Sequence, residues 1–113
     1  MELSSLESDL IGDLAQDSHG LWEIFEFIKL HHPESSEQAI FNRGREIIAS
    51  WLARGWLSLP ADPKLRGGVT SENELLSLLD HLGKKVMVAS DELPWVDLSE
   101  KAFHDVVWLR KKT

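Results

Sequence analysis

Carboxylates dominate the first third of the chain, and their spacing suits the binding of a cationic partner. Residues 1–40 contain nine acidic side chains and one basic side chain, Lys29, which gives this segment a net charge of −8. Asp9, Asp13 and Asp17 recur every four residues, so they would form an acidic line along a helix. Such a line mimics phosphate groups and attracts basic proteins, and it would equally serve as a solvated surface that favours solubility.

Further candidate partner-binding residues lie outside this line of three aspartates. Two glutamates follow on the next expected helix, and a tryptophan comes directly after Pro94 in a segment rich in acidic residues. An exposed tryptophan in such a loop can anchor a protein interface, and the alternative is that it folds back over the core. The residues predicted to bind a partner are therefore Asp9, Asp13, Asp17, Glu23, Glu26 and Trp95.

A second set of side chains suits nucleic acid instead. Residues 41–113 contain eleven basic and ten acidic side chains. Amide and guanidinium groups in the third expected helix and the loop after it are typical of phosphate and base contacts. The residues of this alternative DNA-binding site are Asn42, Arg43, Arg45, Arg54, Lys64 and Arg66. Glu37 and Glu46 on the same helix count against it, and Arg43 and Arg45 could pair with acids of the first two helices.

Signatures of catalysis and metal binding are missing from the sequence. There is no cysteine, and none of the five histidines has the spacing of a metal site on one helix. No serine-nucleophile motif and no phosphate-binding glycine loop occurs. We therefore expect a protein without enzymatic activity, cofactor or metal.

Length and hydropathy indicate one domain in the cytoplasm. The 113 residues suit a single domain that spans residues 1–113. No apolar run approaches the ~20 residues that cross a bilayer, and the first residues do not resemble a signal peptide. The absence of cysteine fits a reducing compartment. We expect no membrane association, and the sequence leaves the oligomeric state open.

Periodicity and capping residues predict the elements that position these side chains. Helices are expected at residues 3–16, 20–31 and 36–54, the last one closed by a left-handed Gly55. Gly44 within that helix suggests a close contact with another helix. A strand should follow at 56–59, and a helix opened by a capping box should lie between Ser71 and Gly83. Further strands are expected at 85–89 and 104–110, with a helical turn capped by Ser99 between them.

The order of these elements predicts a mainly helical α+β fold. Three helices would form the core, and the strands at 56–59 and 104–110 would form a C-terminal β-hairpin. The minimal fold with this order is the winged helix. Here the segment between the two strands, 60–103, is much longer than an ordinary wing and contains its own helix.

Three stretches resemble a group of small bacterial proteins with a winged-helix-like core. They are DLIGDL at 9–14 followed by GLWE at 20–23, LARGWL at 52–57, and DVVWL at 105–109. The resemblance covers both ends of the chain and implies the fold, and its residues are apolar and structural. Some small acidic proteins of this kind are immunity partners of bacterial toxins.

Charge and resemblance together predict a non-enzymatic binding protein. The leading hypothesis is an acidic immunity protein that neutralises a basic bacterial toxin, such as a nuclease. The alternative is a winged-helix transcriptional regulator that binds DNA through its third helix.

Overall fold

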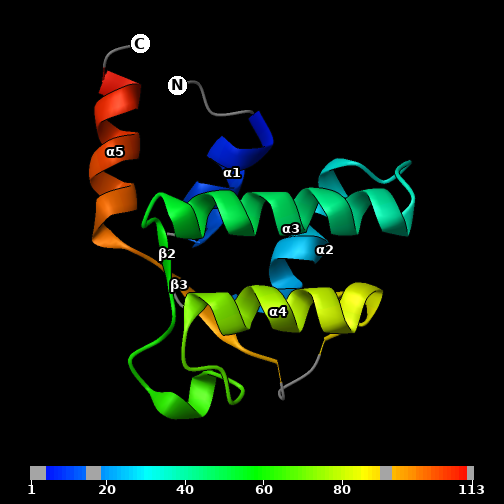
Figure 1. Ribbon diagram of the computed structural model, residues 1–113. Helices are drawn as coiled ribbons and strands as arrows, with labels where there is room; N and C mark the ends of the chain where they lie inside the picture. Colours follow the sequence, from blue (N-terminus) through cyan, green and yellow to red (C-terminus); the bar gives the residue numbers. More distant parts are fainter. Residues whose placement is uncertain (1–4, 15–18, 90–92, 112–113) are drawn as a thin grey trace.

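A computed structural model describes residues 5–14, 19–89 and 93–111, with the backbone alone for 106–111. Five α-helices, two short 3₁₀ helices and three short strands follow one another in the described residues (Figure 1). In chain order they are α1 (Ser5–Leu14), β1 (His19–Gly20), α2 (Leu21–His31), α3 (Glu37–Ala53), β2 (Leu57–Ser58), η1 (Pro63–Leu65), α4 (Glu72–Leu82), η2 (Gly83–Met87), β3 (Trp95–Leu98) and α5 (Glu100–Lys111). The fold is mainly helical α+β, as predicted.

The three strands form one small antiparallel sheet in the order β1-β3-β2. On one edge of β3, His19 pairs with Val96 and Gly20 with Trp95. On the other edge, β2 pairs with Asp97 and Leu98. The sheet therefore joins the start of α2 to the end of α3. The joining strand, β3, lies about forty residues after β2 in the chain.

Apolar faces of the helices meet in one core. Side chains of α1, α2 and α3 are buried at helical spacing, and Phe25 and Trp51 are the largest of those that are fully buried. The contact expected at Gly44 is present: a Cβ atom added there would lie 2.3 Å from a ring carbon of Phe25. Glycine thus allows α3 to approach α2 closely, and α4 packs alongside α3 (Figure 1).

Capping residues explain where the helices begin and end. The Ser36 hydroxyl accepts a hydrogen bond from the Ala39 amide at 3.1 Å, and the Ser71 hydroxyl accepts one from the Glu74 amide at 3.2 Å. Gly55 follows α3 with a φ of 74°, the left-handed conformation predicted for it. The predicted limits of α2, α3 and α4 agree with the structure to within one or two residues.

The prediction of a strand at 104–110 is wrong, because these residues belong to α5. The second strand of the predicted C-terminal β-hairpin is instead β3, which precedes Ser99. Ser99 ends the strand and starts the helix: its hydroxyl accepts from the Ala102 amide at 3.4 Å. Lys101 and Asp105, one helical turn apart, then form an ion pair at 2.6 Å. These local contacts outweigh the weak strand preference of β-branched residues.

The strand expected at 85–89 is also wrong. Gly83 has a φ of 56° and ends α4, and the chain continues directly into the 3₁₀ helix η2. Val86 of η2 is fully buried, and η2 packs against α2, α3 and α4. The insertion between β2 and β3 does contain its own helix, α4, as predicted. Within the described residues no helix is long and apolar enough to cross a membrane.

Candidate functional site

The acidic line on α1 faces solvent where the structure describes it. Leu6, Leu10 and Leu14 are buried on the inner face of α1, which turns Asp9 and Asp13 outward. The Asp9 side chain is 56% exposed, and its carboxylate lies 3.9 Å from Nε2 of His31. Among the residues whose side chains the structure describes (5–14, 19–89 and 93–105), none that is basic forms an ion pair with Asp13. Asp17 lies outside the described residues.

Glu23 supports the start of α2. Its carboxylate accepts a hydrogen bond from the Gly20 amide at 2.6 Å and lies 3.3 Å from Nδ1 of His19. This is the reciprocal half of a capping box, so the side chain is half-buried and engaged with its own helix. Glu26, one turn later, is exposed.

Trp95 lies in β3 and not in a loop. It is half-buried and pairs with Gly20, while the neighbouring Pro94 carbonyl accepts a hydrogen bond from the Leu21 amide at 2.9 Å. The prediction of a loop around this tryptophan is therefore wrong. Because Trp95 pairs with Gly20, it lies at the end of the sheet where α2 begins. Glu23, which caps α2, lies in the first turn of that helix.

Two arginines of the alternative DNA-binding site pair with carboxylates. Arg43 lies 3.1 Å from Glu46 on its own helix and 3.5 Å from Glu7 of α1. Arg45 donates two hydrogen bonds to Asp80 of α4, at 2.7 and 3.0 Å. Hydrogen bonding to Arg45 also holds the pKa of the Asp80 carboxyl below its usual value. Pairing with an acid of α1 was foreseen for Arg43, whereas the partner of Arg45 comes from the insertion.

The other residues of that site are dispersed. The Arg54 guanidinium lies 4.8 Å from the centre of the Trp56 ring, a cation–π distance. Arg66 donates hydrogen bonds to two carbonyls of its own loop, those of residues 60 and 61, at 2.7 and 3.2 Å. Asn42 accepts a hydrogen bond from Gln38 at 2.9 Å. Lys64 is exposed and lies in η1, which is outside α3.

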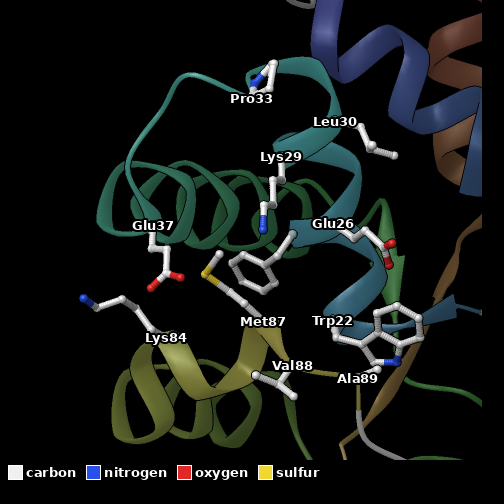
Figure 2. Close-up of a pocket in the computed structure, with 11 residues that line it drawn as sticks. Trp22, Glu26, Lys29, Leu30, Pro33, Glu37, Lys84, Met87, Val88 and Ala89 are labelled. Carbon is white, nitrogen blue, oxygen red and sulfur yellow. The ribbon is translucent and has the colours of Figure 1, made fainter.

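Sequence reasoning did not foresee a groove between α2 and η2. Its volume is about 780 Å³, and aromatic and aliphatic side chains form most of its lining (Figure 2). Lys29 and Glu26 stand on the α2 side, and Met87 and Val88 on the opposite side. The only sequence signal was the wide apolar surface of α2, which includes Trp22.

Among the described residues, no group of three or more histidine, aspartate or glutamate side chains could hold a metal ion. Comparison of the chain with protein-family models, with curated proteins and with solved structures finds no match.

Proposed function

We propose that the chain is a non-enzymatic binding protein that docks a basic protein onto the carboxylates of α1. In its concrete form, it is a cytoplasmic immunity protein that neutralises a basic bacterial toxin. The observation that carries this proposal is the exposure of Asp9 and Asp13 on one outward face, within a segment of net charge −8. Exposed charge of one sign costs little in water and is available to an incoming partner.

The proposed mechanism is electrostatic attraction followed by steric blocking. A cationic cleft on a toxin, especially one that binds phosphate, would be attracted to carboxylates on the rigid helix α1. The inner leucines of α1 fix the direction of those carboxylates, so no loop has to be ordered on binding. Glu26 extends the negative charge onto α2, and the half-buried Trp95 offers apolar contact at the sheet. Glu23 would act indirectly, by holding the start of α2.

Affinity capture with matched variants tests the proposal. The chain is immobilised and exposed to lysate of the cells that encode it, as wild type and as Asp9→Asn/Asp13→Asn. A control variant, Glu72→Gln/Glu100→Gln, removes the same charge from exposed positions on α4 and α5. We expect wild type and control to retain one basic protein that the aspartate variant loses. Recovery of no basic protein, or equal recovery by all three, would contradict the proposal.

One observation favours DNA binding as a second candidate. The order α1-β1-α2-α3-β2 is followed, after η1, α4 and η2, by β3, which pairs between the other two strands, and this order is compatible with a winged helix whose α3 would enter the major groove. Against it, Arg43 and Arg45 are engaged by carboxylates, and α4 packs alongside α3. We therefore rank it second.

Fluorescence anisotropy with a labelled random-sequence duplex at low salt separates the two candidates. The leading proposal predicts no saturable binding. Binding that weakens steeply as salt is added would favour the second candidate, because each phosphate contact releases counterions.

A further inference from the structure

Apolar side chains that remain partly exposed to solvent gather around the groove between α2 and η2. Phe25 is fully buried beneath it, and Trp22 and Met87 are half-buried along it. Leu30 and Val88 stand at its borders with 74% and 67% of their surfaces exposed. They are two of the three large apolar side chains that are most exposed in the described part of the chain. Such clustering around one concavity is typical of a ligand site.

One cation points into this apolar groove. Figure 2 shows the Lys29 side chain extending from α2 toward Met87, while the Glu26 side chain extends away from it. Among the described residues, no acidic side chain lies within ion-pair distance of Lys29. Glu37 and Lys84 also line the groove, on the side away from Trp22 (Figure 2). The Lys29 ammonium therefore stands over the apolar lining without a described carboxylate at ion-pair distance.

We propose that this groove binds a small amphipathic acid, with an apolar body along the half-buried Trp22 and Met87 and a carboxylate beside the Lys29 ammonium. The groove volume of about 780 Å³ suits a small organic molecule. A charged hydrogen bond from the exposed Lys29 ammonium would add to these apolar contacts. Neutral analogues would keep the apolar contacts and lose the ion pair, and cationic analogues would be repelled. The proposal does not depend on the acidic face of α1.

Calorimetric titration with three ten-carbon probes tests this assignment. The probes are decanoate, decanol and decyltrimethylammonium, each used below its aggregation concentration. We expect saturable binding of decanoate with one molecule per chain, weaker binding of decanol, and the weakest binding of the cation. No saturable binding of decanoate, or binding of the cation as tight as that of decanoate, would overturn the proposal.

Two variants locate the site. Lys29→Gln should weaken decanoate binding about tenfold, because it removes one charged hydrogen bond, and should leave decanol binding nearly unchanged. Lys85→Gln, an exposed neighbour that does not line the groove, is the charge-matched control and should bind decanoate as wild type does. Equal affinity of wild type and Lys29→Gln would overturn the proposal.

The NMR signal of the Met87 methyl group gives a second measurement of binding, independent of calorimetry. The chain has two methionines, so its ¹³C-methyl spectrum contains two methionine signals, and Met87→Leu identifies the one in the groove. Decanoate should shift the Met87 signal and leave that of Met1 in place. A Met87 signal that stays constant while decanoate binds would place the ligand elsewhere and overturn the assignment.

Discussion

Replacing Gly44 by alanine tests the close packing of α3 on α2, which supports both the core and the groove. A Cβ atom at this position would lie 2.3 and 2.6 Å from two ring carbons of Phe25, well inside van der Waals contact. The Phe25 ring is fully buried and stacks on Phe41 with its centroid 5.9 Å away. The ring therefore has little room to move aside, and the helices would have to separate.

The expected loss of stability follows from two opposing terms. Adding a methyl group to a filled core costs about 1–3 kcal/mol, and the severe contact at Gly44 places the cost at the upper end. Alanine regains about 1 kcal/mol because it favours the helix more than glycine does. We therefore expect a net loss of about 2 kcal/mol, which for a chain of this length lowers the melting temperature by roughly 8 °C.

Urea and thermal unfolding followed by circular dichroism measure this difference. The matched control is Gly12→Ala on α1, where an added Cβ meets no atom within 4 Å, and it should stabilise the protein by up to about 1 kcal/mol. In a Phe25→Leu background the cost of Gly44→Ala should shrink, because the ring carbons that it meets are gone. A Gly44→Ala protein as stable as wild type would refute this account of the packing.

Two further predictions concern α4, which borders α3. Asp80 has a pKa below its usual value of 3.8 because Arg45 donates a hydrogen bond to it, so its contribution to stability is present above that pH and is lost as the pH falls below it. Arg45→Met should return the pKa to its usual range in a carboxyl NMR titration, and an unchanged value would contradict the pairing. Ser71→Ala should lower the free energy of unfolding in urea by about 1 kcal/mol because it removes a helix cap. Ser77→Ala, an exposed site on the same helix, is the control, and equal losses in both would contradict the role of the cap.

Local signals in the sequence were sufficient for most helices. Capping serines and left-handed glycines act through the backbone within one turn, so the limits of α3 and α4 can be read directly from residues such as Ser71 and Gly55. The apolar spacing of α1 and α2 predicts their buried faces for the same reason. The close approach at Gly44 was also foreseen, because a glycine inside a helix has a cost that usually requires a packing reason.

The sheet could not be predicted in the same way, because its strands are too short to have a pattern. β1 and β2 contain two residues each, and they exist because β3 pairs with both. Such pairing joins residues far apart in the chain, and no alternation over two residues reveals it. The β-branched and aromatic run after His104 was a false signal for a strand, since strand preference depends on the surroundings.

The candidate sites show the same division between local and long-range information. The outward position of Asp9 and Asp13 follows from their spacing against the buried leucines of α1. The partner of Arg45 is Asp80, thirty-five residues away, so only the fold reveals that this arginine is engaged. The groove depends on η2 packing against α2, which no local pattern of residues indicates.

The association rate of the captured basic protein, measured against salt concentration, tests the proposed function most directly. Stopped-flow mixing should give a rate that falls steeply as salt screens the carboxylates of α1. At low salt, Asp9→Asn/Asp13→Asn should associate about three- to tenfold more slowly than wild type, with a much smaller change in the dissociation rate. A rate that is insensitive to salt, or a variant that associates as fast as wild type, would contradict an acidic docking face on α1.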